Sequence, residues 1–298
     1  SVFRALNAGL LGGAEQFRQR YALPIERDRD QGRQAALSAL IRPFVLRRVK
    51  EEVARELPER TEIEVPVTLT GKERELYDAL RRAAIDELTA SVTAPSQRRL
   101  QALAALTRLR QAACHPRLVD EASTLPSSKL ARLREIVEEL RQEGHRALIF
   151  SQFVRHLALV REMLDADGVT YRYLDGATPE RSRRQEVDAF QDGEGDVFLI
   201  SLRAGGTGLN LTAATYVIHL DPWWNPAVED QATDRAHRIG QTKPVTVFRL
   251  VAQNTIEESI LALHDHKRSL VAGVLAGTAD GATLGVEEIL ELLGWDGG

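Results

Sequence analysis

The sequence predicts an α/β protein built on a parallel sheet that helices cover on both faces. From residue 128 onward, short apolar runs alternate regularly with amphipathic stretches of helical period. Apolar strands separated by amphipathic helices are typical of parallel sheets that are buried on both faces. In such sheets, ligands bind beyond the carboxyl ends of the strands. The segments that follow each strand are therefore where a functional site is expected.

Each element of this alternating region is assigned from its apolar pattern. The predicted strands are residues 146–150, 171–174, 197–201, 216–220 and 245–251. The predicted helices are residues 129–143, 153–166, 179–191, 227–238 and 256–274.

The first part of the chain has a different, mainly helical pattern. Helical spacing predicts helices at 15–21 and 34–57, followed by a strand at 62–69 in which Pro66 permits only an edge or a bulge. Helices then extend to about residue 115, with a polar break at 93–99. The small polar segment 121–128 is the predicted main boundary. The expected domains are residues 1–57, 58–126 and 127–274, with a tail at 275–298 that carries a short helix at 286–293.

Composition excludes several classes of protein. The 298 residues are 43% hydrophobic and 28% charged, as in ordinary globular proteins, and one cysteine (Cys114) rules out a disulfide framework or a cysteine-based zinc site. No run is long enough to span a membrane, no signal peptide is recognisable, and no metal ligands are predicted. A net charge of −4 means that nucleic-acid binding would require a local basic surface.

Polar, glycine-rich or aromatic residues follow four of the predicted strands. Because the carboxyl ends of parallel strands share one edge of the sheet, these segments predict a single functional rim. The rim consists of Ser151 and Gln152, then residues 175–178, 202–210 and 221–225.

The last of these segments leads into a helix that carries two arginines. On a helix at 227–238, Gln231, Arg235 and Arg238 recur at spacings of four and three and share one face. Two guanidinium groups on one face suit a phosphate chain, which they bind in bidentate fashion. The alternative is a solvated helix on which the arginines pair with Glu229, Asp230 and Asp234.

Residues 203–210 and the Trp223-Trp224 pair are further candidates. The glycines allow the backbone to approach a phosphate, with Arg203, Thr207 and Asn210 as polar partners, or they serve only a tight turn. The tryptophans stand between two prolines. One is expected to be a buried anchor, and the other could stack on or wedge into a nucleic acid.

The rim segments, taken together, resemble the second motor lobe of the SWI/SNF-related ATPases, a branch of the superfamily-two helicase-like motors. Two upstream segments resemble the region that joins this family's first lobe to its second. The ordered set covers nearly the whole chain: IRPFVLRRVKEEVARELPERTE (41–62), LTGKERELYDAL (69–80), ALIFSQF (147–153), YRYLDGATPERSRRQEVDAFQ (171–191), FLISLRAGGTGLNLTAA (198–214), VIHLDPWWNPAVEDQATDRAHRIGQ (217–241) and VTVFRLVAQNTIEESIL (245–261).

This resemblance implies a RecA-like lobe that closes over ATP held by a partner lobe. Arg235 and Arg238 match the family's arginine fingers, Gln231 belongs to the same motif, and Gly205 and Gly206 would contact the nucleotide. The residues implied to contact duplex DNA are Ser151, Gln152, Gly176, Thr178, Arg203, Thr207, Asn210 and Trp224. Two positions depart from the family pattern: many relatives carry an acid at Trp223 and an aliphatic residue at Thr207.

The chain lacks two motifs that phosphoryl transfer needs. Neither a G-x-x-x-x-G-K-[ST] loop nor an acidic Mg²⁺ box is present, and the chain does not begin with Met. The expectation is a fragment whose first lobe is absent apart from its tail, with ATP and Mg²⁺ held by that lobe in the full-length motor. We expect residues 1–298 alone to bind no cofactor and to hydrolyse ATP negligibly.

The leading hypothesis is therefore the C-terminal half of an ATP-dependent double-stranded DNA translocase that resembles chromatin remodellers. Its expected partners are duplex DNA and the first motor lobe, without a membrane or a second copy of the chain. The expected location is nucleoid DNA in the cytoplasm, or the nucleus in a eukaryote. Two alternatives remain: a non-catalytic nucleic-acid-binding module, and a helicase lobe of a neighbouring superfamily-two family.

Overall fold

The computed structural model describes residues 7, 9–26, 30–44, 56–90, 95–204 and 208–262. The chain divides into two compact units. One comprises residues 1–53 and 262–285, and the other comprises residues 54–261 and 286–298.

The first unit is helical. Helix α2 (Ala14–Phe17) continues through a π-helical turn (Arg18–Ala22) into α3 (Leu23–Glu26). Helix α4 (Gln31–Ile41) begins at Asp30, whose carboxylate accepts a hydrogen bond from the Arg33 amide at 3.0 Å. The predicted helix at 34–57 is wrong in its extent, because a 3₁₀ turn that contains Pro43 (Arg42–Phe44) follows α4. Residues 45–55 lie outside the described part of the chain.

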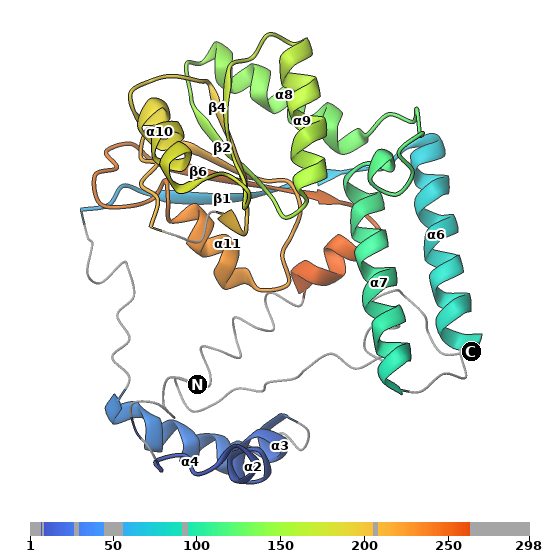
Figure 1. Ribbon diagram of the computed structural model, residues 1–298, viewed down its shortest axis with the longest axis vertical. Coiled ribbons are helices and arrows are strands. Elements are labelled where there is room, and N and C mark those ends of the chain that lie inside the picture. The colour runs from blue at the N-terminus through green and yellow to red at the C-terminus, as the bar shows by residue number, and fades with distance from the viewer. Residues whose placement is uncertain are drawn as a thin grey trace. The chain divides into compact units, whose positions relative to one another are not determined.

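The second unit contains a six-stranded sheet in the order β1-β6-β5-β2-β4-β3, in which all five pairings are parallel (Figure 1). The predicted α/β class is confirmed. The strand bounds lie within two residues of those predicted: β1 Arg60–Val67, β2 Ala147–Ser151, β3 Tyr171–Leu174, β4 Val197–Ser201, β5 Tyr216–His219 and β6 Val245–Ala252.

Helices cover both faces of this sheet because strand side chains alternate between the faces. In β2, Ile149 packs with the apolar side chains of α8 (Ser128–Gln142) and α9 (Val154–Ala166). Its neighbour Phe150 lies in the opposite cluster, which includes residues of α10 (Glu180–Gln191) and α11 (Pro226–Thr233). All five residues of β2 are buried, as expected for a central parallel strand.

Strand β1 lies at the edge of the sheet and pairs only with β6, with Pro66 opposite Val251. The edge position predicted from Pro66 is confirmed. Because β1 belongs to this sheet, the boundary predicted near residue 127 falls inside one compact unit. Between β1 and α8, helices α6 (Gly71–Ala90) and α7 (Pro95–Cys114) pack on each other as a hairpin. Helix α7 begins at Pro95, inside the predicted break at 93–99.

After β6 the chain is helical over residues 256–262, and the rest of the helix predicted at 256–274 lies outside the described residues. The short helix predicted at 286–293 also lies outside them. Among the described helices, none combines the length and the apolar character needed to cross a membrane.

The buried histidine at the end of β5 makes the stability of the sheet unit sensitive to acid. His219 is 1% exposed, and its Nε2 lies 3.0 Å from the Thr233 hydroxyl. Burial lowers the pKa of His219 to about 4, whereas the pKa of the unfolded chain is near 6.5. The unfolded state therefore takes up the proton first as the pH falls. Stability present above pH 6.5 should be lost as the pH falls towards 4, by up to about 3 kcal/mol from this residue.

We expect His219→Gln to unfold with a weaker dependence on acid than the parent chain. Urea unfolding midpoints at pH 7.5 and pH 5 would measure this difference. Buried His156, whose pKa burial also lowers, should leave some acid sensitivity in the variant. Identical pH dependence in the two proteins would contradict a contribution from His219.

Candidate functional site

The predicted rim exists as a single edge of the sheet. Because all six strands are parallel, the segments after β2, β3, β4 and β5 leave the sheet on the same side. Gly205, Gly206 and Thr207 lie outside the described residues, so their contacts with nucleotide or DNA stay predictions.

The two arginines of the rim do not lie on α11, contrary to the prediction of a helix at 227–238. Helix α11 begins at Asn225, whose side chain accepts a hydrogen bond from the Ala227 amide, and ends at Thr233. Residues 234–240 form turns, because the Arg235 and Ala236 amides bond to carbonyls three residues back, at 3.1 and 3.0 Å. We call residues 234–241 the arginine turn. The argument from a shared helix face therefore fails, although the turn keeps the arginines together.

The two guanidinium groups differ in exposure. Arg238 is exposed, and its Nη1 donates to the carbonyl of Leu209 at 3.2 Å and lies 3.5 Å from that of Gly208. Arg235 is 7% exposed, and its Nε has no hydrogen-bond partner among the described residues. Burial and the nearby positive charge of Arg238 both lower the pKa of Arg235. The turn thus holds two adjacent cations against the end of the glycine loop, residues 202–210.

The carboxylates that could have neutralised these arginines bind elsewhere. Glu229 is fully buried, where it accepts a hydrogen bond from the Trp223 amide at 2.7 Å and pairs with Arg249 at 3.0 Å. Asp230 pairs with Arg60 at 3.1 Å. Within the described part of the chain, Arg235 and Arg238 form no ion pair with any carboxylate. The ion pairs of the solvated-helix alternative are therefore not formed among the described residues, although the charge of Asp234 still acts on Arg235.

Backbone contacts fix the arginine turn to the segment that follows the glycine loop. The amide of Leu211 donates to the Arg235 carbonyl at 2.9 Å. The side-chain amide of Gln241, a residue that is 6% exposed, donates to the carbonyls of Thr212, Ala214 and Ala236 at 3.0, 3.0 and 3.1 Å. The sequence motif contained Gln241 but gave no sign of this role, which depends on carbonyls up to 29 residues away.

The residues predicted to contact DNA differ in accessibility. Gly176, Arg203 and Asn210 are exposed, and Gln152, Thr178 and Trp224 are partly exposed. Ser151 is fully buried in the described conformation, so the direct contact predicted for it stays a prediction that would need this side chain to become exposed. Its hydroxyl instead donates to Asp221 and accepts a hydrogen bond from the Phe153 amide at 3.1 Å.

The exposed glycine after β3 sits on a turn that a carboxylate organises. Asp175 accepts hydrogen bonds from the amides of Ala177 and Thr178 at 2.9 and 3.1 Å. Burial alone would raise the pKa of Asp175, but hydrogen bonds from Tyr173 and from these turn residues hold it below its ordinary value. The charged form of the carboxylate is therefore favoured, and it holds Gly176 at the tip of the turn.

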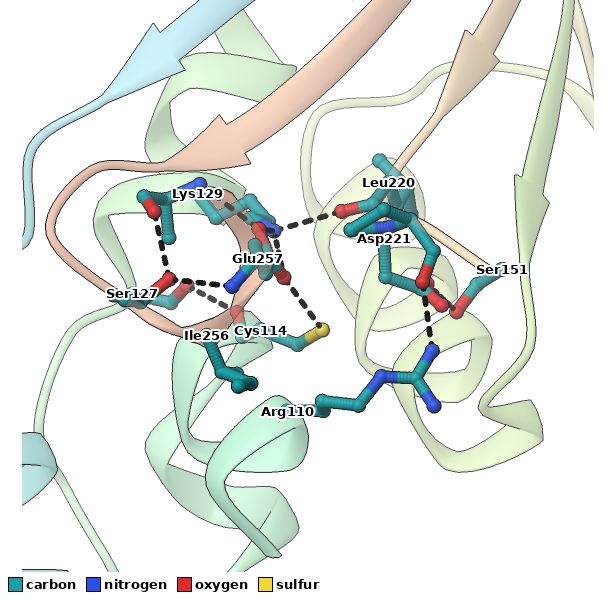
Figure 2. Close-up of polar contacts among 12 residues, drawn as sticks. Arg110, Cys114, Ser127, Lys129, Ser151, Leu220, Asp221, Ile256 and Glu257 are labelled. Carbon is teal, nitrogen blue, oxygen red and sulfur yellow. Dashed lines mark hydrogen bonds and ion pairs between the residues drawn. The ribbon is translucent and has the colours of Figure 1, made fainter. Parts of the chain in front are cut away.

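A buried polar cluster lies beneath the segment that follows β5 (Figure 2). Lys129 is fully buried and donates to both carboxylate oxygens of Glu257 at 2.6 Å and to the Leu220 carbonyl at 2.9 Å. The thiol of Cys114 lies 3.7 Å from the same carboxylate. Cys114 is the last residue of α7 and is a buried free cysteine. None of these long-range contacts could be read from local sequence.

Three members of this region could offer ligands to a metal ion. The ligand atoms of Cys114, His156 and Asp221 lie within 4.8 Å of one another. The charge around them disfavours a cation, because Lys129 and Arg110 are both close enough to act on the Cys114 thiol and the Asp221 carboxylate. Asp221 is also engaged by the Ser151 hydroxyl and by the Gln152 amide at 3.2 Å. We therefore assign these side chains to the packing of the unit.

The sequence of this chain matches two known protein-family domains. Residues 1–118 match the SNF2-related domain, and residues 128–240 match the helicase conserved C-terminal domain. The chain belongs to the SNF2-related, SWI/SNF-like family. Strands β2 to β5 of the RecA-like sheet lie within the second match, and β1 and the helices before α8 lie within the first.

Relatives of this SNF2-related chain come from bacteria, archaea and animals. The putative ATP-dependent helicase/translocase YwqA of Bacillus subtilis is 40% identical over 98% of this chain and 32% of its own length. The SWI/SNF-related matrix-associated actin-dependent regulator of chromatin subfamily A member 1 of Mus musculus is 39% identical over 78% of this chain and 23% of its own. This chain thus spans a third or less of these relatives.

Solved structures of the same family share the fold. The Sulfolobus solfataricus SWI2/SNF2 ATPase core in complex with dsDNA is 32% identical, with a TM-score of 0.65, and the match covers 97% of this chain and 62% of that one. The Sulfolobus solfataricus SWI2/SNF2 ATPase core domain matches with a TM-score of 0.66 and 32% identity, over 98% and 60% of the two chains.

Proposed function

We propose that this chain supplies the C-terminal half of an ATP-dependent double-stranded DNA translocase, in which its arginine turn completes an ATP site held by another lobe. The observation that carries this proposal is the Arg238 guanidinium, which is exposed, lies against the glycine loop and has no carboxylate partner among the described residues. An exposed, uncompensated guanidinium suits an anionic ligand. The ATP-dependent relatives make a phosphate chain the natural ligand.

The residues of this chain would act on ATP from one side only. Arg238 and Arg235 would neutralise charge that develops on the transferred phosphoryl group. Gln231, which is exposed on α11, and the backbone at Gly205 and Gly206 would complete this side of the cleft. Mg²⁺ and the phosphate-binding loop would come from the other lobe, so we propose that residues 1–298 alone do not turn over ATP.

The rim would also hold the backbone of duplex DNA. Exposed Arg203 offers a charge, Asn210 and Thr178 offer hydrogen bonds, and the turn tip at Gly176 offers backbone amides. Groups of this kind contact phosphates without reading the base sequence. The partly exposed ring of Trp224 would stack on or wedge into the DNA beside them. DNA binding would thus be local to the rim, in agreement with the net charge of −4.

Binding of residues 1–298 to a fluorescent DNA duplex tests this proposal. We expect the affinity to fall steeply as salt rises, and Arg203→Ala to reduce the slope of log affinity against log salt by about 1. Trp224→Ala should weaken binding about tenfold and leave the slope unchanged, because it removes stacking and not charge.

Arg141→Ala serves as the control, since Arg141 lies at the end of α8, near the opposite edge of the sheet. It should bind DNA as the parent chain does. Equal affinities and equal salt slopes for the parent chain, Arg203→Ala and Trp224→Ala would count against the rim as a DNA-binding surface.

A further inference from the structure

A buried arginine connects the α6–α7 hairpin to the rim. Arg110, which is labelled in Figure 2, lies on α7 and is 4% exposed. Its Nη2 donates to the Pro222 carbonyl at 2.7 Å. Its guanidinium also lies 5.0 Å from the ring centre of Trp224, 5.7 Å from that of Trp223 and 5.8 Å from that of Phe153. One cation thus contacts residues that follow two different strands. We call residues 221–225 the tryptophan turn.

The carboxylate of Asp221 also links the tryptophan turn to the segment that follows β2. It accepts hydrogen bonds from the Ser151 hydroxyl and, at 3.2 Å, from the Gln152 amide. Asp221 is itself the first residue of the tryptophan turn, and its charge acts on Arg110. The tryptophan turn and the Ser151-Gln152 loop are therefore held together by one acid and one base, and the base comes from the hairpin.

A cation in this position needs a reason. Removal of a guanidinium from water is costly unless its partners compensate, and aromatic rings attract a cation more strongly when water is excluded. Arg110 has only part of its hydrogen-bonding capacity filled, because its Nε has no partner among the described residues. An apolar side chain would fill the same space without that cost. Unlike an apolar side chain, the planar guanidinium can fix the orientation of its partners, which are the Pro222 carbonyl and the aromatic rings.

We propose that Arg110 is a positioning residue that sets the orientation of the tryptophan turn and the Ser151-Gln152 loop for duplex DNA, and so couples the α6–α7 hairpin to the DNA-binding rim. The proposal rests on the proposed function, in which Trp224 and Gln152 contact DNA. Arg110 itself is buried and would touch no DNA. It acts through the residues that it holds.

Tryptophan emission and duplex affinity test this proposal in residues 1–298. The chain has three tryptophans, so Trp295→Phe leaves only the pair in the tryptophan turn as emitters. In this background, we expect Arg110→Gln to shift the emission to longer wavelength and to weaken duplex binding about tenfold, through loss of the cation–π contacts and the hydrogen bond. Arg110→Lys keeps the charge without the planar fork and should restore only part of the affinity.

Arg146→Gln is the matched control. Arg146 likewise lies over a ring, 4.0 Å from the centre of Phe190, and donates to a carbonyl, that of Gly195 at 3.0 Å. It lies immediately before β2, at the edge of the sheet opposite the rim. If Arg110 served only the stability of the unit, both variants would lower the melting temperature and neither would change the affinity of the folded protein for DNA.

A double-mutant comparison separates failure of this proposal from failure of the proposed function. Where Trp224→Ala weakens binding, Arg110→Gln added to it should cost less than twofold more, because the residue that it positions is gone. A full tenfold additional loss would overturn the positioning role, as would normal binding by folded Arg110→Gln. If Trp224→Ala itself leaves the affinity unchanged, the proposed DNA contact fails instead, and the positioning role that rests on it is overturned too.

Discussion

Replacement of Arg238 by alanine should lower duplex-stimulated ATP hydrolysis by about 10³- to 10⁵-fold when this chain works opposite a nucleotide-binding lobe. The guanidinium of Arg238 is exposed and is held at the end of the glycine loop by the Leu209 carbonyl. An arginine finger acts on charge that develops in the transition state, so its loss lowers kcat far more than it raises KM for ATP. The fold should be unaffected, because the described side-chain hydrogen bonds of Arg238 are those to Gly208 and Leu209 at 3.5 and 3.2 Å, and alanine keeps its backbone bonds.

A chimera provides the measurement. Residues 1–298 would replace the matched segment of YwqA, a relative that is 40% identical to this chain, so that the remainder of that protein surrounds them. Steady-state hydrolysis with and without duplex DNA should show the loss in Arg238→Ala. Arg238→Lys should recover little, because an ammonium cannot form the bidentate fork.

Two controls make the result interpretable. Arg141→Ala removes a surface arginine near the opposite edge of the sheet and should hydrolyse ATP at the parent rate. Residues 1–298 without the remainder of YwqA should show negligible turnover, with or without DNA. If the Arg238→Ala chimera hydrolysed ATP at the parent rate, Arg238 would not act as an arginine finger. Robust turnover by residues 1–298 alone would overturn the inference that the phosphate loop and Mg²⁺ come from elsewhere.

The two arginines of the turn are not equivalent, although the resemblance assigns both to the same motif. Arg238 is already exposed, whereas Arg235 is 7% exposed with its charge disfavoured by burial and by its neighbour. A bound phosphate would relieve that cost by adding negative charge to that of Asp234, which offsets only part of the effect of burial and of Arg238. In the described conformation the Arg238 guanidinium is therefore exposed to a ligand, and the Arg235 side chain lies buried beside it.

Strands β2 and β4 could be predicted closely because each is a short, mostly apolar run whose five residues are all buried. Strands β3 and β4 have the bounds that the sequence predicts. The end of α11 could not be predicted in the same way. Arg235 and Arg238 continue the helical spacing, but the turn that follows Thr233 depends on the bonds from Leu211 and Gln241, which only the tertiary structure provides.

Residue identity marked the rim but did not separate the residues that face solvent from those that support them. Ser151 and Gln152 are adjacent polar residues at the end of a strand, yet the first is fully buried and the second is partly exposed. The difference arises because Asp221, 70 residues later, takes the serine hydroxyl. Arg110 escaped the sequence prediction for the same reason, since its partner Pro222 lies 112 residues away.

Removal of one partner of the Lys129–Glu257 ion pair should destabilise the sheet unit by about 3–5 kcal/mol. Both side chains are buried, and the ammonium has three acceptor contacts, to the two carboxylate oxygens and the Leu220 carbonyl. Burial alone would lower the pKa of Lys129, but the Glu257 carboxylate raises it above its ordinary value. In Lys129→Met this carboxylate would remain buried, and the donors left to it among the described residues would be the Ala252 amide and the Cys114 thiol.

Urea unfolding of Lys129→Met, Glu257→Leu and the double variant measures this effect. The double variant should be more stable than either single variant, because no uncompensated charge remains in the apolar interior. The matched control is the exposed pair of Arg134 and Asp167, whose 2.7 Å contact is nearly as short as the 2.6 Å of the buried pair. Arg134→Ala should cost less than about 1 kcal/mol, since water solvates the remaining carboxylate.

The buried Lys129–Glu257 pair also contacts the segment that leads into the rim. Lys129 lies in the first turn of α8, and Glu257 follows β6. The Leu220 carbonyl that Lys129 binds immediately precedes the tryptophan turn. Lys129→Met, which removes this contact and leaves Glu257 without its ion-pair partner, should therefore loosen the turn as well as lower stability. The double variant should recover the stability. Equal losses from the buried and the exposed pair would show that burial is not the cause. Recovery of stability without recovery of duplex affinity would show that the Leu220 contact itself positions the turn.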